Sequence, residues 1–306
     1  MDWSPYADPV TCEASLQAHT DAGLRTVLAL GGTDGPSLEE LRDRCVASAG
    51  PRTLVAAGSG PPGDDDAGAR WDAARALGLR VHAHGGPGQA RGAIAAAPLA
   101  EDVTLIHLPA LDDQDGSAIA SSGAAVAMTP AAEMARGDGS PPVQALVDRD
   151  VRPGLGVDDE QVTPGDLFAQ MRAMISLQHA MVFDRKLAGK AGVPKLMSTR
   201  DVIRSATVDG ARAAGLAGLT GSLVPGAQAD VVVLRTDRPN IFPINDPIGA
   251  VVWGMDTSNV DHVFVGGHGV VRDGALTGDV ARARELATAA RTRVMAAAGL
   301  AVGGAA

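Results

Sequence analysis

Residues 77–84 read Leu77-Gly78-Leu79-Arg80-Val81-His82-Ala83-His84, and they decide the fold because a glycine ends one helical segment just before a short strand begins. The same unit of aliphatic run, turn and alanine-rich helical stretch recurs roughly every 20 to 30 residues from Arg25 to Val157. Parallel strands joined by single helices leave their carboxyl ends on one face, where functional residues gather. The predicted strands are Arg25–Leu30, Thr53–Ala57, Arg80–His84, Val103–His107, Ala124–Met128 and Pro153–Val157.

Capping residues mark two of the helices between these strands. Ser37 with Glu40 three residues later is typical of a capping box, and Asp112 precedes a helical run through Ser121. No strand is recognisable between Thr53–Ala57 and Arg80–His84, so the sheet is predicted to lack a member there.

Beyond Val157 the pattern changes to two long helices and then to a β-rich stretch with a glycine-rich hairpin turn at residues 266–269. A final helix, about Asp279–Ala298, is expected to pack back on the barrel. The division predicted from this pattern is a barrel over residues 1–218, a small β-rich unit over 219–276, and a helix and tail over 277–306. The later elements are predicted at Asp166–Leu187 and Ser198–Asp209 for the helices, and at Val231–Leu234, Val251–Trp253, Val260–Val265 and Val270–Arg272 for the strands.

The composition narrows the class of protein. With 45% hydrophobic but only 3% aromatic residues, the interior must be filled by aliphatic side chains, which favours parallel α/β sheets. A net charge of −10 argues against nucleic acid and anionic membranes as partners. Neither Cys12 nor Cys45 belongs to a Cys-x-x-Cys pair, and no apolar run reaches the roughly 18 residues that span a bilayer. We therefore expect a cytoplasmic protein and exclude nucleic acid as its partner.

Three strand ends carry residues that can bind a divalent metal. His82 and His84 share one face of their strand because side chains alternate with a period of two. His107 ends the next strand, and Asp158 and Asp159 follow Gly154-Leu155-Gly156-Val157. Imidazoles and a carboxylate on neighbouring strand ends predict a zinc or iron site with positions left open for water and substrate. His19, His179, His262 and His268 are expected to be solvated or structural.

These segments resemble the amidohydrolase superfamily, in its branch of chlorohydrolases and aromatic-base deaminases. Residues 77–84 resemble the family's fifth barrel strand, His107 to Asp113 the sixth, Met128-Thr129-Pro130 the end of the seventh, and residues 154–158 the eighth. The most specific likeness is Gly221-Ser222-Leu223-Val224-Pro225-Gly226-Ala227-Gln228-Ala229-Asp230-Val231-Val232-Val233-Leu234, which is similar to the family's return into its small β-sandwich.

The resemblance implies a (β/α) TIM-type barrel and a metal-activated water that hydrolyses a C–N or C–Cl bond of a small molecule. It implies that His84, His107 and Asp158 bind zinc or iron, with His107 either a metal ligand or a residue that polarises the electrophile. Asp158, which would also take the proton from water, and His107 are the residues expected to be catalytic. His82, Asp159 and Thr129 are then expected to contact the substrate.

The sequence departs from the family's pattern at two places. The family's first-strand His-x-His pair has no counterpart before Arg25, so the barrel is expected to be incomplete at its amino terminus and the metal to be weakly bound or absent. Pro87 stands where deaminases place a proton-shuttling glutamate. A missing strand would leave an open sheet edge, which predicts a homodimer.

Three functions stay open on these grounds. The first is a metal-dependent hydrolase with a reduced ligand set. The second is a metal-free enzyme that uses the pocket for dehydration, cyclisation or isomerisation by acid–base residues. The third is a non-catalytic relative that binds a ligand or a partner chain.

Overall fold

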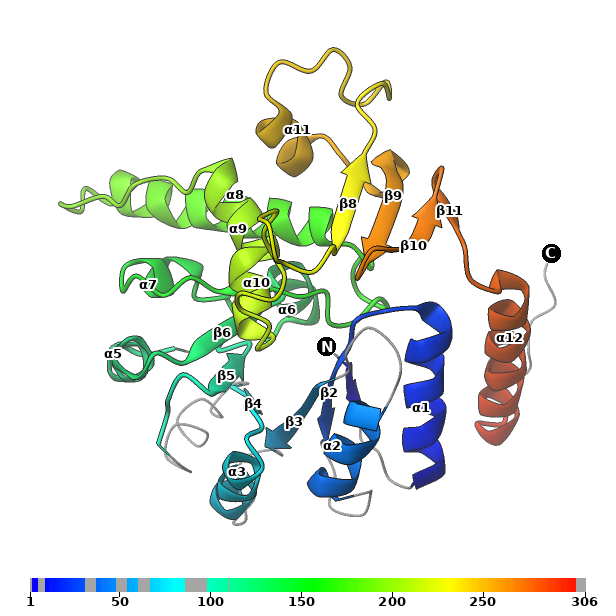
Figure 1. The fold of residues 1–306 in the computed structure, drawn as a ribbon. Helices are drawn as coiled ribbons and strands as arrows, with labels where there is room; N and C mark the ends of the chain where they lie inside the picture. Colours follow the sequence, from blue (N-terminus) through cyan, green and yellow to red (C-terminus); the bar gives the residue numbers. More distant parts are fainter. Residues whose placement is uncertain are drawn as a thin grey trace.

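A computed structural model describes residues 2–4, 9–30, 37–47, 54–59, 67–85, 98–109 and 111–300. Its main sheet has seven parallel strands, whose order in space follows their order in the chain (Figure 1). Helices follow the strands as in a TIM-type barrel, and β1 and β7 are the end strands of the described sheet. The strands are β1 Asp2–Ser4, β2 Val27–Leu30, β3 Leu54–Ser59, β4 Val81–His84, β5 Val103–Ile106, β6 Ala125–Met128 and β7 Gly154–Leu155.

The outer face of this sheet packs against helices. Val81 and Ala83 belong to one core cluster with Trp71, Ile119 and Met174, which come from three different helices. Alternation along β4 therefore turns His82 and His84 toward the inner face. The helices of this part are α1 Pro9–Ala22, α2 Leu38–Ala47, α3 Ala67–Ala76, α5 Asp113–Ser122, α6 Pro130–Arg136, α7 Val143–Val147 and α8 Leu167–Leu187.

A short helix, α10 (Val208–Ala213), packs on the inner face near the amino ends of the strands. The Thr104 hydroxyl donates to the carbonyl of Ala213 over 2.8 Å. Gly154 allows the close approach, because a Cβ atom there would lie 2.8 Å from the Cα of Gly210. The helix thus fills the floor of the barrel, and the space above it faces the carboxyl ends of the strands.

A second sheet of four antiparallel strands follows in the order β11-β10-β9-β8. The Arg25 guanidinium ties it to the barrel through Asp230, with nitrogen-to-oxygen distances of 2.6 and 3.0 Å. Asp230 also accepts from the amide of Gly266 over 2.7 Å. The elements here are α9 Thr199–Ala206, β8 Val231–Leu234, α11 Pro247–Trp253, η1 Thr257–Asn259, β9 Val260–Val265, β10 His268–Arg272 and β11 Ala275–Leu276.

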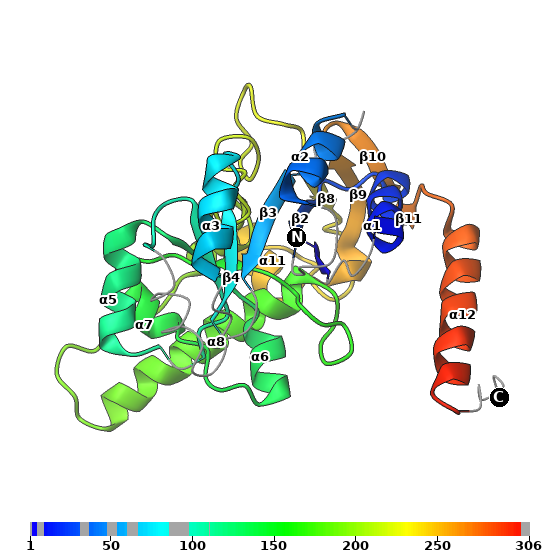
Figure 2. The ribbon, with the colours of Figure 1, turned by 90° about the horizontal axis from the view of Figure 1, so that it is seen from below.

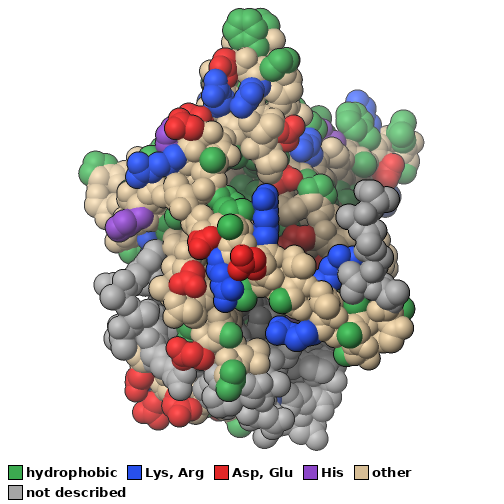
Figure 3. Space-filling view, turned by 90° about the vertical axis from the view of Figure 1, so that its right-hand side faces the viewer, with side chains coloured by type: hydrophobic (Ala, Val, Ile, Leu, Met, Phe, Trp, Pro, Cys, Tyr) green, Lys and Arg blue, Asp and Glu red, His purple; other side chains and the backbone are tan. Residues whose placement is uncertain are grey.

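The last helix, α12 (Val280–Ala297), does not pack on the barrel as expected, since none of its residues is buried. Figures 1 and 2 show it standing apart from the rest of the molecule. Figure 3 shows the molecule from the side on which α12 lies in Figure 1, where acidic, basic and hydrophobic side chains are scattered over the described surface. None of the helices in the described ranges is long and apolar enough to cross a bilayer.

Three other predictions of secondary structure were wrong. The sheet has no gap before β4, because Ala57 of β3 pairs directly with Val81, and β1 adds a strand that the sequence did not reveal. Residues 251–253 end helix α11 instead of forming a strand, because the Asp246 side chain accepts from the amide of Ile248 and caps it. The helix expected over 198–209 breaks at Thr207, whose ψ of −91° is not helical.

Candidate active site

A cavity of about 680 Å³ lies on the inner face of the main sheet, and its lining includes residues at the carboxyl ends of the strands. We call it the inner-face cavity. It is bounded by the ends of four neighbouring strands, the loop after β7, and three helices. Its walls comprise His19, His82, His84, Ile106, His107, Ala127, Thr129, Gly154, Leu155, Gly156, Val157, Asp158, Glu160, Leu167, Gly210, Ala213 and Ala214.

Both histidines of β4 reach this cavity. His82 is 1% exposed, and its ring nitrogens have no hydrogen-bond partner among the described residues. Burial, and then the nearby charge of Arg80, lower the pKa of His82 to about 3. Burial, and then His107, lower the pKa of His84 to about 4. Both rings are therefore neutral at pH 7, so each offers one nitrogen lone pair to a ligand.

His107 follows the end of β5 and stacks against His84, with ring centroids 5.4 Å apart and planes inclined by 25°. Its φ of +77° and that of Leu108, +83°, lie in the left-handed region that non-glycine residues rarely adopt. The amide of His107 donates to the carbonyl of Ala127 over 2.9 Å, which fixes the turn. Such strained backbone concentrates at functional sites, where surrounding contacts hold it.

Asp158, in the loop after β7, also lines the cavity and has a positive φ, +69°. The guanidinium of Arg136, at the end of α6, donates to its carboxylate and to that of Asp138. Asp159 does not line the cavity. Its carboxylate accepts from the amide of Gln161 over 2.8 Å, so it caps the following turn.

Of the residues proposed from sequence, the structure brings five to one cavity and leaves Asp159 outside it. The five are His82, His84, His107, Thr129 and Asp158. Pro87 lies outside the described residues.

Three further residues of this site were not predicted from the sequence: His19, Glu133 and Arg136. His19 lines the cavity from α1, although we expected it to be solvated or structural. Glu133 and Arg136 act on His107 and Asp158 from α6. In the sequence, the one indication that Glu133 and Arg136 belong to the site is their position on the helix that starts at the end of β6.

The donor set suits a divalent metal in its chemistry, since His84, His107 and Asp158 are ligand types that zinc and iron accept. A polar occupant of the cavity would satisfy the two ring nitrogens of His82, which have no hydrogen-bond partner in the part of the chain that the structure describes. The three side chains would have to move closer together to hold one ion, because in the described ranges their ligand atoms do not all lie within 4.8 Å of one another. One carboxylate oxygen of Asp158, Oδ2, is already paired with the guanidinium of Arg136. The group that does meet this spacing, Asp261 with His262 and Asp273, lies in the small sheet.

Comparisons with known proteins agree with the family resemblance of the sequence. Residues 56–270 match the model of the amidohydrolase family. A 5-methylthioadenosine/S-adenosylhomocysteine deaminase of Syntrophus aciditrophicus (strain SB) is 30% identical over 176 residues, which are 57% of this chain and 38% of that protein. A 5'-deoxyadenosine deaminase of Methanothermobacter thermautotrophicus is 31% identical over 171 residues, 56% of this chain and 38% of that protein. The matched region thus spans 38% of the length of these relatives.

Two solved structures share the fold. An adenosine deaminase from Xanthomonas campestris with bound zinc superposes with a TM-score of 0.78 at 19% identity, covering 93% of this chain and 69% of the other. An atrazine chlorohydrolase from Arthrobacter aurescens TC1, complexed with zinc, gives a TM-score of 0.77 at 19% identity, covering 94% and 71%.

Proposed function

Because the chain belongs to the amidohydrolase family, we propose that its inner-face cavity hydrolyses a C–N or C–Cl bond of a small molecule. The observation that carries this proposal is the meeting of His84, His107 and Asp158, from three separate segments, around one cavity. A volume of about 680 Å³ suits a ligand of nucleoside or triazine size. Relatives are named as deaminases of adenosine derivatives, and a structural neighbour is named as an atrazine chlorohydrolase.

In this proposal His84, His107 and Asp158 hold a zinc or iron ion. When bound, the ion lowers the pKa of a water molecule and polarises the electrophile. Asp158 accepts a proton from the attacking water and returns it to the leaving group. His82, neutral at pH 7, and Thr129 contact the substrate from the cavity wall.

The second candidate is metal-free acid–base chemistry, and one contact favours it. The guanidinium of Arg136 already neutralises the Asp158 carboxylate, which is the charge that a metal would otherwise balance. In that case Asp158 and His107 transfer protons directly.

The test is metal analysis of the purified protein together with turnover of 5-methylthioadenosine, S-adenosylhomocysteine, 5'-deoxyadenosine and atrazine, followed as released ammonia or chloride. We expect one zinc or iron ion per chain, and loss of both metal and activity in His84→Ala. His262→Ala is the matched control, because His262 belongs to the acidic group of the small sheet and could contribute adventitious metal. Undiminished turnover by metal-free protein would select the acid–base alternative.

We further propose a homodimer, formed through the sheet edges. Among the described residues β1 and β7 each have a neighbour on one side only, and an open edge exposes amide and carbonyl groups that favour pairing. Light scattering on the purified chain tests this, and a monomeric mass would contradict it.

A further inference from the structure

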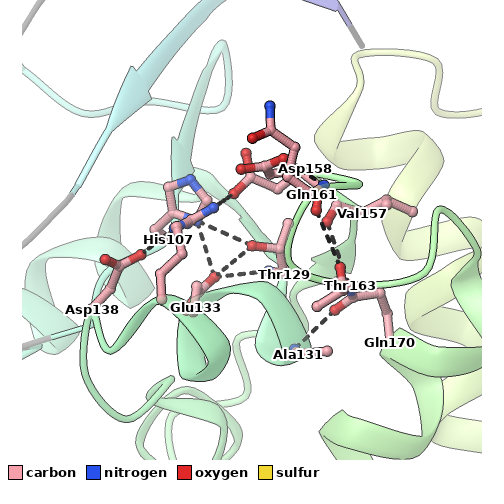
Figure 4. Close-up of polar contacts among 12 residues, drawn as sticks. His107, Thr129, Ala131, Glu133, Asp138, Val157, Asp158, Gln161, Thr163 and Gln170 are labelled. Atoms are coloured by element: carbon pink, nitrogen blue, oxygen red, sulfur yellow. Dashed lines mark hydrogen bonds and ion pairs between the residues drawn. The ribbon is translucent and has the colours of Figure 1, made fainter. Parts of the chain in front are cut away.

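Glu133 is the middle residue of α6 and is fully buried beside the inner-face cavity. Its Oε1 accepts the backbone amide hydrogen of Thr129 over 2.8 Å and lies 3.1 Å from Nδ1 of His107 (Figure 4). The Thr129 hydroxyl also donates to Oε1, over 3.3 Å. The other carboxylate oxygen of Glu133, Oε2, has no hydrogen-bond partner among the described residues.

These contacts decide where the His107 ring carries its proton. An amide N–H can only donate, so Oε1 acts as an acceptor toward Thr129. A carboxylate oxygen has no proton to donate, so Nδ1 of His107 is the donor of the 3.1 Å contact. The Thr129 hydroxyl lies 3.4 Å from the same nitrogen, but its proton goes to Oε1. A neutral ring protonated at Nδ1 carries its lone pair on Nε2.

We propose that Glu133 is a positioning residue, which holds the proton of His107 on Nδ1 so that the Nε2 lone pair is available in the cavity. The consequence of this tautomer for metal binding rests on the proposed function. Of the two roles that the family resemblance leaves open for His107, metal ligand or polarising donor, this tautomer supports the ligand, because a ligand needs a lone pair and a donor needs N–H. Carboxylates commonly orient metal-binding histidines in this way.

A capping role alone does not account for Glu133. The N-cap residue, Thr129, makes no side-chain capping bond to α6, and Gln170 already accepts from the amide of Ala131 in the first turn. Contact with the ring of His107, 26 positions earlier, is the feature that a helix cap does not need.

The tautomer is measured directly by long-range ¹H–¹⁵N correlation on metal-free protein labelled at histidine, at about pH 8.5, well above the reference histidine pKa of about 6.5. His107→Gln assigns the signals. We expect the wild-type ring to be protonated at Nδ1, to stay so in Glu133→Gln, whose amide oxygen can still accept, and to become a mixture of tautomers in Glu133→Leu. Gln170→Leu is the control, because Gln170 is equally buried and binds the same helix without touching His107.

Zinc titration gives a second readout. Glu133→Leu is expected to weaken zinc binding by about 10- to 100-fold, the usual effect of removing a partner of a ligand. A wild-type ring protonated at Nε2, or a Glu133→Leu variant with unchanged tautomer and zinc affinity, would overturn the proposal even if the enzyme is an active hydrolase. If wild-type protein binds no zinc, the metal-dependent function fails, while the expected tautomer in wild type and its loss in Glu133→Leu still support the role of Glu133.

Discussion

Replacing His82 by leucine tests whether the inner-face cavity holds a buried, neutral imidazole. The ring is 1% exposed, and burial lowers its pKa from 6.5 to about 3. Between these pH values the unfolded chain binds more protons than the folded chain, so the free energy of unfolding falls as the pH falls. The contribution of the neutral His82 ring to the free energy of unfolding is complete above pH 6.5, and it is lost progressively as the pH falls toward 3.

The size of the effect follows from the pKa difference. Between the two pKa values, each pH unit changes the free energy of unfolding by about 1.4 kcal/mol. From about pH 6.5 to about pH 4.5, protonation of His82 should therefore lower the free energy of unfolding of the wild type by about 2 kcal/mol. His82→Leu has no such group and should lose correspondingly less.

Urea unfolding followed by circular dichroism, at a series of pH values, measures the difference between the two proteins. His82→Gln is the matched control, since it keeps a polar amide but cannot titrate. Both variants should therefore diverge from wild type with the same pH dependence, whatever their stability at neutral pH. A difference from wild type that stays constant down to about pH 4.5 would refute the argument.

Three further changes have defined outcomes. Arg136→Met frees the carboxylate of Asp158 and should tighten zinc binding by about 10-fold, as measured by isothermal titration; unchanged affinity would show that this ion pair does not compete with metal. Asp230→Asn breaks the bidentate pair with Arg25, which is 6% exposed, and should lower the free energy of unfolding by about 2 kcal/mol in urea; a loss below about 0.5 kcal/mol would contradict a structural role. Ser198→Ala removes the capping box of α9 and should cost about 1 kcal/mol in the same assay, whereas an unchanged unfolding midpoint would argue against it.

Local patterns were enough to predict much of the barrel. The aliphatic runs of the strands repeat with regular spacing, and their period of two placed His82 and His84 on one face. The helix starts were equally readable: Ser37 and Glu40 exchange the hydrogen bonds of a capping box, and the Asp112 side chain accepts from the amide of Asp115.

The failures came where tertiary contacts outweigh local preference. β1 is three residues long and is defined by its pairing with β2. No aliphatic run in the sequence indicates that residues 2–4 form a strand. Val251, Val252 and Trp253 favour a strand by composition, but the cap supplied by Asp246 and Pro247 makes them helical. The role of Glu133 depends on a side chain 26 positions away, so no local pattern could reveal it.

The order of the seven strands bears on how the chain is made. Each strand pairs with the one synthesised just before it, so the sheet can grow while translation proceeds, with one new edge added at a time. The bond between Arg25 and Asp230 joins residues 205 positions apart. It can form only after residue 230 has left the ribosome, so the barrel and the small sheet are joined by this contact late in synthesis.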